Sequence, residues 1–392
     1  MPGNFFIMDF SLTEEQMTIR QAARDFAKQE CLPGVIERDE KQQLPREQLM
    51  KLGDLGFMGM MVSPEYGGAG MDTVSYVLAM EEISKIDASV SVAMSVNNSL
   101  VCWGLDNYGS PFQKEKYLRY LAAGKKDGAL YMGAFLLSEP EAGSDATSQK
   151  TIAVEKKDHY ILNGMKNWIT NGNSASVYLV MAQTNVSKGS KGINAFVVEK
   201  NTPGITVGTK ENKLGIRGSD THSIGFNEVI VPKENRIGED GFGFQFAMKT
   251  LSGGRIGIAA QALGLASGAF ELSLKYSKER KSFGTEIKNH QIIQFKLADM
   301  ATRIEASRLL CLKAAKEKDM GLDYAISSSM AKVFASETAM WTTTEAVQIH
   351  GGYGYVKEYH VERLMRDAKI TQIYEGTSEV QRIVISRSIL KG

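Results

Sequence analysis

The sequence predicts an α+β protein, mostly α, with a helical N-terminal domain, a middle β-barrel-like domain and a C-terminal four-helix bundle. Helical periodicity dominates up to residue 128 and again after residue 241, and six short segments rich in β-branched or aromatic residues lie between. Only 8 prolines occur among the 392 residues, which permits long helices. We place the three domains at residues 8–128, 129–240 and 241–392.

The N-terminal domain opens with a helix, because Thr13-x-x-Gln16 forms a capping-box pattern. Apolar residues at helical spacing follow it. A Gly/Pro-rich loop at 64–70 breaks the pattern, and helical signal resumes over 73–86 and 90–105.

The middle domain holds six predicted strands, at 152–154, 160–162, 177–181, 194–198, 205–207 and 229–231. They do not alternate with long helices, so a barrel or sandwich is favoured over a doubly wound parallel sheet. Asn163-Gly164 follows the second strand and predicts a type I′ hairpin turn.

The C-terminal domain holds four predicted helices, at 243–278, 289–318, 322–349 and 378–390. Their short connections favour an antiparallel bundle. The spacing Ser378-x-x-Gln381 predicts a capping box at the start of the last helix.

Composition excludes several classes of function. The 46 Lys and Arg balance 45 Asp and Glu, so we expect no nucleic-acid partner and no broad attraction to anionic membranes. No unbroken apolar stretch is long enough for a bilayer, and the N-terminus lacks signal and transit features. Cys31, Cys102 and Cys311 are odd in number and suit a reducing compartment. We therefore expect the cytoplasm for a bacterial chain, or the mitochondrial matrix for an already processed one.

Familiar catalytic motifs are absent from the sequence. No Gly-x-Gly-x-x-Gly follows a predicted strand, and there is no P-loop or nucleophile elbow. The five histidines lack metal-ligand spacing and no cysteine pair accompanies them, so we expect no metal site.

Two segments of the middle domain carry more information. Residues 135–145 run from a strand into a turn that ends in Ser144 and Asp145, which suits close approach of a flavin ring or an anion, or an ordinary turn. In residues 163–172, Trp168 stands two residues before Thr170. This pair can flank a planar cofactor, although a core tryptophan gives the same pattern.

Two segments of the C-terminal domain complete the set. Glu375 lies beside Tyr374 and just before the last helix, as a carboxylate favoured by the helix dipole or as a base whose pKa burial raises. Residues 348–354 run from a helix end into a glycine turn, which serves as a C-cap or lets backbone approach a pyrophosphate.

Taken together and in this order, the four segments make the chain resemble the acyl-CoA dehydrogenase family over essentially its whole length. Further segments resemble the short-chain, butyryl-CoA branch, namely 95–100, 254–259, 295–300 and 377–379. The resemblance implies an FAD cofactor, an acyl-CoA substrate and reoxidation by an electron-transfer flavoprotein. It also implies a homotetramer built as a dimer of dimers, with FAD bound partly across a subunit boundary.

The resemblance also assigns site residues by position. Those for the flavin and its pyrophosphate are Phe135, Leu137, Ser138, Gly143, Ser144, Trp168, Ile169 and Thr170. Those for the adenine end, supplied by the neighbouring subunit, are Arg280, Phe283, Gln291, Gln348, Gly351 and Gly352, completed by Thr377 and Glu379. Those for the CoA thioester are Ser144, Ser252, Gly254, Arg255, Tyr374 and Gly376.

Glu375 matches the family's catalytic base, which implies removal of the substrate α-proton while the β-hydride passes to flavin N5, giving a trans-2-enoyl-CoA. Some relatives supply this base from the position of Gly254, which cannot serve here. Residues 90–92 carry no arginine for a dicarboxyl substrate. The alternatives are a branched short-chain or medium-chain dehydrogenase, an acyl-CoA oxidase and a non-catalytic DNA-associated relative.

Overall fold

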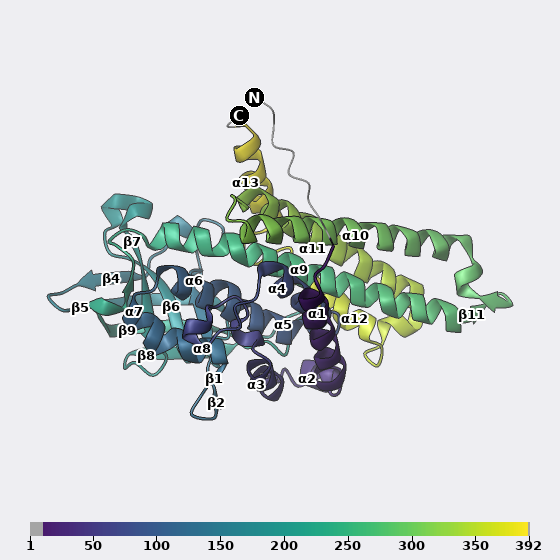
Figure 1. The fold of residues 1–392 in the computed structure, drawn as a ribbon, viewed down its shortest axis with the longest axis horizontal. Coiled ribbons are helices and arrows are strands. Elements are labelled where there is room, and N and C mark those ends of the chain that lie inside the picture. Colours follow the sequence, from purple (N-terminus) through teal and green to yellow (C-terminus); the bar gives the residue numbers. More distant parts are fainter. Residues whose placement is uncertain (1–10, 391–392) are drawn as a thin grey trace.

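The computed structural model describes residues 11–390 and confirms the predicted fold class. Figure 1 shows the β domain at one end of an elongated molecule, with the long helices α9, α10 and α11 extending from it to the other end. The N-terminal helices pack along one side of these long helices.

The N-terminal region is built around two helices that are buried over their whole length, α4 (Thr73–Ser84) and α5 (Ala88–Ser95). The predicted capping box of α1 (Glu14–Phe26) is confirmed, because Thr13 and Gln16 form both of its hydrogen bonds. A π-helical turn over Val96–Cys102 continues α5 into α6 (Trp103–Tyr108). The remaining helices are α2 (Val35–Glu40), α3 (Arg46–Asp54), α7 (Pro111–Gln113) and α8 (Arg119–Ala123).

The middle region forms an eight-stranded sheet of order β10-β7-β6-β4-β5-β9-β8, with β3 pairing parallel to β6. A separate two-stranded ribbon, β1 (Lys125–Lys126) with β2 (Ala129–Leu130), precedes it. All six predicted strands are present. The strands of the large sheet are β3 (Gly133–Leu136), β4 (Ile152–Glu155), β5 (His159–Thr170), β6 (Val177–Gln183), β7 (Ile193–Glu199), β8 (Ile205–Lys210), β9 (Thr221–Pro232) and β10 (Arg236–Ile237).

The hairpin turn predicted at Asn163-Gly164 is wrong. Both residues lie inside β5, where the register with β9 shifts between Leu162 and Gly164 as a β-bulge. Gly164 has φ +147°, and a Cβ there would lie 2.5 Å from Thr151 Oγ1 on the neighbouring chain segment. Glycine is needed here for a bulge and a close approach rather than for a turn.

The C-terminal region confirms the four predicted helices as α9 (Gly243–Glu279), α10 (Gln291–Asp319), α11 (Ala325–His350) and α13 (Ser378–Leu390). A fifth helix, α12 (His360–Ile370), packs against α9 and α11. A small ribbon, β11 (Lys281–Ser282) with β12 (Thr285–Glu286), joins α9 to α10 at the end far from the sheet (Figure 1).

The capping box predicted for Ser378 and Gln381 is wrong. Thr377 caps α13 instead, because its Oγ1 accepts a hydrogen bond from the backbone N–H of Val380 at 3.3 Å. The Gln381 side chain is used elsewhere: its Nε2 donates to the carbonyls of Glu375 and Gly376.

Helix α9 is long and apolar enough to qualify as a membrane-spanning candidate by length and composition alone. Protein covers 83% of its most apolar window. The apolar surface of α9 is therefore used for packing inside the bundle.

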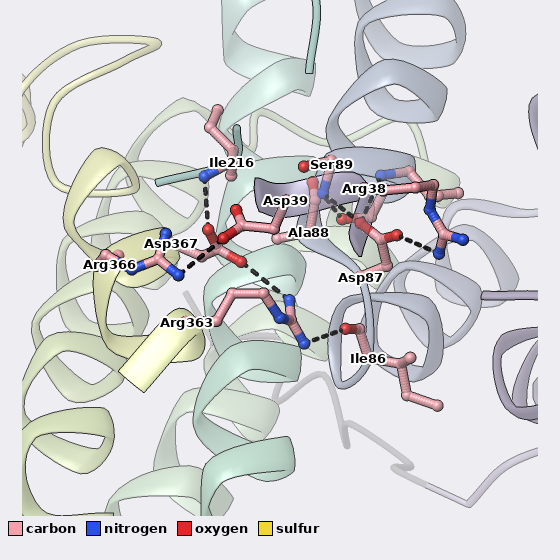
Figure 2. Close-up of polar contacts among 12 residues, drawn as sticks. Arg38, Asp39, Ile86, Asp87, Ala88, Ser89, Ile216, Arg363, Arg366 and Asp367 are labelled. Carbon is pink, nitrogen blue, oxygen red and sulfur yellow. Dashed lines mark hydrogen bonds and ion pairs between the residues drawn. The ribbon is translucent and has the colours of Figure 1, made fainter. Parts of the chain in front are cut away.

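A buried polar cluster ties all three regions together where α12 meets them (Figure 2). The Asp367 carboxylate accepts hydrogen bonds from the backbone N–H of Ile216 and from Arg363, at 3.1 Å for the latter. Arg363 also donates to the carbonyl of Ile86 in the N-terminal region at 2.7 Å. This cluster fixes α12, and α12 leads directly into the loop that carries Glu375.

Candidate active site

A cavity of about 290 Å³ lies where the three regions meet. Its apolar walls come from α5, the π-helical turn that follows it, and α9. The other walls come from the β domain, at the end of β3 with the turn after it and at the end of β5, and from the loop before α13. The lining residues are Val92, Val96, Leu100, Phe135, Leu137, Ser138, Gly143–Thr147, Trp168–Thr170, Phe244, Met248, Leu251, Arg255, Tyr374–Gly376 and Val380.

Glu375 is the titratable group of greatest interest in this cavity. Its carboxylate Oε2 is shielded from solvent and has no hydrogen-bond partner among the described residues. Burial raises the pKa of Glu375 to about 7, although the charges of Lys332 and Arg255 act in the opposite direction. A carboxylate with this pKa and no fixed partner can accept a proton near neutral pH.

Gly254 makes room for this carboxylate. A Cβ at Gly254 would lie 2.0 Å from Glu375 Oε2 and 2.7 Å from Leu100 Cδ2. The side chain of Glu375 therefore packs directly against the backbone of α9.

The loop that carries Glu375 is held from three helices. The Tyr374 hydroxyl donates to Gln261 Oε1 on α9, and Lys332 Nζ on α11 donates to the Gly376 carbonyl at 2.7 Å. Gln381 on α13 donates to the same carbonyl at 2.9 Å. These bonds hold an unusual backbone, since Glu375 has φ +53° and Gly376 has φ +92°.

A second wall of the cavity is formed by the end of β3 with the residues after it and by the end of β5. The backbone N–H of Asn167 donates to the Ser138 carbonyl at 2.9 Å and joins the two segments. Beneath them, the fully buried Lys166 pairs with Glu139 at 2.8 Å and donates to the Leu137 carbonyl at 3.1 Å. This ion pair fixes the wall from behind.

This wall fits a flat ring system. Trp168 has φ +61° and is 60% exposed, so its indole stands free beside the cavity, while Leu137 and Ile169 are buried. No atom lies within 4 Å of the position that a Cβ of Gly143 would take, so the turn is open. Several hydroxyl side chains line the same cavity, among them those of Ser138, Ser144 and Thr170.

The residues predicted for the adenine end lie elsewhere in the chain. The Arg280 guanidinium stands over the Tyr353 ring at 5.5 Å, where the start of β11 meets the glycine turn after α11. Phe283 is 96% exposed there. Arg255 and the end of α9 at Glu279 are 24 residues apart, which is about 36 Å of helix. Arg280 and Phe283 therefore lie far along α9 from the cavity.

Three other predicted residues do not line the cavity but are next to lining residues in the chain. Ser252 lies on α9 next to Leu251 and donates its hydroxyl to the Met248 carbonyl. Thr377 and Glu379 stand at the start of α13, beside Gly376.

Sequence reasoning missed Lys332 and the apolar floor formed by Val92, Val96 and Leu100. The only signal for Lys332 is a single lysine in the run Ser-Met-Ala-Lys-Val-Phe-Ala of a helix made mostly of small and apolar residues. Among the residues that the structure describes, no three His, Cys, Asp or Glu side chains group together as metal ligands.

Solved structures of similar sequence share the whole fold. The chain is 48% identical to butyryl-CoA dehydrogenase from Megasphaera elsdenii, with a TM-score of 0.95 over 98% of this chain and 100% of that one. It is 50% identical, with a TM-score of 0.96 and the same coverage, to a chain from a structural study of the electron transferring flavoprotein of Acidaminococcus fermentans and flavin-based electron bifurcation.

Sequence comparison gives the same result. The short-chain specific acyl-CoA dehydrogenase of Clostridium acetobutylicum is 50% identical over 384 residues, 98% of this chain and 100% of that protein. The family models for the N-terminal, middle and C-terminal domains of acyl-CoA dehydrogenase match residues 13–125, 134–229 and 241–390. The predicted resemblance is thereby confirmed, and the chain belongs to the acyl-CoA dehydrogenase family.

Proposed function

We propose that this enzyme is an FAD-dependent dehydrogenase that converts a short-chain acyl-CoA to its trans-2-enoyl-CoA, with Glu375 as the base. The observation that carries the proposal is the Glu375 carboxylate, which is shielded and unpaired and lines the same cavity as Trp168, Ile169 and Thr170. A substrate bound between them would present opposite faces of its Cα–Cβ bond to the two walls.

Each residue then has a chemical task. The backbone N–H of Glu375 polarises the thioester carbonyl, which acidifies the α-carbon, and the Glu375 carboxylate removes the α-proton. The Arg255 guanidinium and the Lys332 ammonium favour the ionised form of Glu375 before the reaction. The apolar side chains of Val96 and Leu100 exclude water from the reacting carbons.

FAD would lie against the wall formed by residues 135–144 and 168–170, and when bound it supplies the acceptor for the β-hydride. Leu137 and Ile169 would pack on the ring system, with Trp168 beside it. Ser138, Ser144 and Thr170 would offer hydroxyl groups to its polar edges.

A short acyl chain fits the apolar end of the cavity. Its floor is made of Val92, Val96 and Leu100, and the cavity volume of about 290 Å³ must hold the acyl chain and part of the thioester arm. Two relatives named above act on short-chain or butyryl-CoA substrates by name.

The electron acceptor, the assembly and the compartment are further parts of the proposal. An electron-transferring flavoprotein is the proposed acceptor, since the study of such a protein contains a chain 50% identical to this one. We propose a homotetramer, because the adenine-end residues lie about 36 Å along α9 from the cavity and can serve a neighbouring subunit. Location in the cytoplasm of a bacterium stays a prediction.

The test of the base is Glu375→Gln, which keeps the size of the side chain and removes its proton affinity. We expect the variant to retain FAD and to bind acyl-CoA, while flavin reduction under anaerobic conditions slows by about 10²–10⁴-fold. Glu239→Gln, which alters an exposed carboxylate, is the matched control and should reduce its flavin at the normal rate. Normal reduction by Glu375→Gln would refute the assignment.

The test of the substrate is anaerobic flavin bleaching with straight-chain acyl-CoAs from butyryl to palmitoyl, and with isobutyryl- and isovaleryl-CoA. We expect butyryl-CoA to give the highest kcat/KM. A maximum at a medium-length or branched substrate would support the alternative dehydrogenases instead, and peroxide release during aerobic turnover would identify an oxidase.

A further inference from the structure

Lys332 is a buried lysine on α11 that sequence reasoning does not assign to any site. Its side chain has no exposed surface, and its Nζ donates to the Gly376 carbonyl at 2.7 Å. Burial of an ammonium group is unfavourable unless hydrogen bonds and opposite charge compensate for it. For Lys332, the hydrogen bond to the loop that carries Glu375 provides this compensation.

We propose that Lys332 is a positioning residue for the proton-abstracting carboxylate: it clamps the backbone after Glu375 and its positive charge favours the ionised base. The proposal rests on the function proposed for Glu375. It assigns two separable contributions to one side chain, a hydrogen bond and a charge.

The hydrogen bond acts on a backbone that is otherwise unfavourable. Glu375 and Gly376 both have φ in the left-handed region, which a glutamate rarely adopts. The Gly376 carbonyl accepts from Lys332 on one side and from Gln381 Nε2, at 2.9 Å, on the other. Two donors from two different helices therefore fix this peptide group and the direction of the Glu375 side chain.

The charge acts against the burial of the base. The charged and titratable groups around Glu375 are Lys332 from α11, Arg255 from α9, Tyr76 from α4 and its neighbour Tyr374. Only the first two are cations. Arg255 donates a hydrogen bond to Ser329 and makes none to the loop among the described residues. Of the two cations, only Lys332 therefore both holds the loop and supplies charge.

The ionisation ranges are compatible with this role. Burial lowers the pKa of Lys332 to about 8, although the Glu375 charge acts to raise it. The pKa of Glu375 is raised to about 7. The pKa of Lys332 is the higher of the two, so Lys332 is charged at the pH where the base begins to lose its proton.

The experiment compares three variants by the pH dependence of kcat/KM, whose acid limb reports the free enzyme's base. Lys332→Met removes clamp and charge, Lys332→Gln keeps a donor without charge, and Lys332→Arg keeps the charge. We expect the acid limb to move upward by about one pH unit or more in Lys332→Met and Lys332→Gln, since an adjacent opposite charge lowers an acid's pKa by about 1–3. It should not move in Lys332→Arg.

The size of the effect should depend on pH. If the pKa of Glu375 rises from about 7 to about 8, the reaction slows about tenfold near pH 6 and hardly at all near pH 9. Lys332→Met should show a further loss that persists at high pH, because the clamp is absent. A loss of the same size at every pH, or an unmoved acid limb in both uncharged variants, would overturn the proposal.

A second measurement needs no turnover. The infrared band of the protonated Glu375 carboxyl, recognised by its disappearance in Glu375→Gln, should titrate at higher pH in Lys332→Gln holoenzyme than in wild type. Lys318→Met is the control for loss of a half-buried lysine, because Lys318 is not among the groups that shift the pKa of Glu375. An unshifted band in Lys332→Gln refutes the role of Lys332 even where Glu375→Gln has confirmed the base.

Discussion

The contact between Gly254 and Glu375 predicts the outcome of a single added methyl group. In Gly254→Ala, the new Cβ would lie 2.0 Å from Glu375 Oε2, whereas ordinary van der Waals contact begins at 3.4 Å. One of the two groups must move by the difference, about 1.4 Å. The carboxylate is the end of a flexible side chain and α9 is a helix packed in the core, so the carboxylate should move.

The displacement sets the size of the catalytic loss. A misplacement of about 1 Å in a reacting group can lower the rate by about 10²-fold, so we expect kcat to fall by at least that factor. Stability should change little. The substitution gains about 0.5–1 kcal/mol of helix preference over glycine, against a local cost of moving Leu100 and the carboxylate.

The assay is anaerobic flavin reduction by butyryl-CoA together with thermal unfolding. Gly253→Ala is the matched control, since the nearest atoms to its Cβ would be Lys318 Nζ at 3.6 Å, the Tyr324 hydroxyl at 3.9 Å and the Ser99 carbonyl oxygen at 4.0 Å, which are ordinary contacts. It offers the same helix preference without the clash. If Gly254→Ala reduces its flavin as fast as Gly253→Ala, the carboxylate does not depend on the space at this glycine and the reasoning fails.

Two further predictions concern buried ion pairs. Lys166→Met leaves the buried Glu139 without its cation, so the free energy of unfolding should fall by about 3–5 kcal/mol in denaturant titrations. Lys150→Met, which breaks the exposed ion pair with Glu141, should lower it far less. Equal effects of the two would contradict the structural role of Lys166. Asp367→Ala leaves Arg363 and the Ile216 N–H without their acceptor at the junction of the three regions, and we expect a loss of about 3–5 kcal/mol in the same titration. A loss below about 1 kcal/mol would show that the junction tolerates its removal.

Elements with strong periodicity were predictable from the sequence. The helices α9, α10, α11 and α13 were predicted to within three residues at each end, because each is long and shows helical patterning or a recognisable start. The same sequence patterns also predicted that Glu375 lies just before the last helix. The domain boundaries stay a prediction.

Two local signals failed because tertiary contacts outweighed them. Asn163-Gly164 is a turn sequence, but β5 continues through it by pairing with β9 on one side and approaching Thr151 on the other. Gln381 could have closed a capping box, but its amide donates to the carbonyls of Glu375 and Gly376 instead. In both places a contact between distant segments decided the conformation.

Of the residues around Glu375, the resemblance assigns Gly254 and Arg255 to the site, whereas Lys332 could not be predicted. Lys332 precedes Glu375 by 43 residues and Gly254 precedes it by 121, by position in the sequence. Lys332 has no neighbouring motif that reveals what it faces. Only the arrangement of α9 against α11, with the loop between α12 and α13 placed on both, brings the three residues together.

At residue 375, which has a left-handed backbone, the residue that favours stability differs from the residue that favours the reaction. A non-glycine residue in this conformation costs about 1–3 kcal/mol, and a shielded, unpaired carboxylate adds a further cost. A glycine would relieve both, so selection for a stable fold alone would remove the glutamate. At this position the protein has therefore retained a residue that lowers the stability of the fold and serves the reaction.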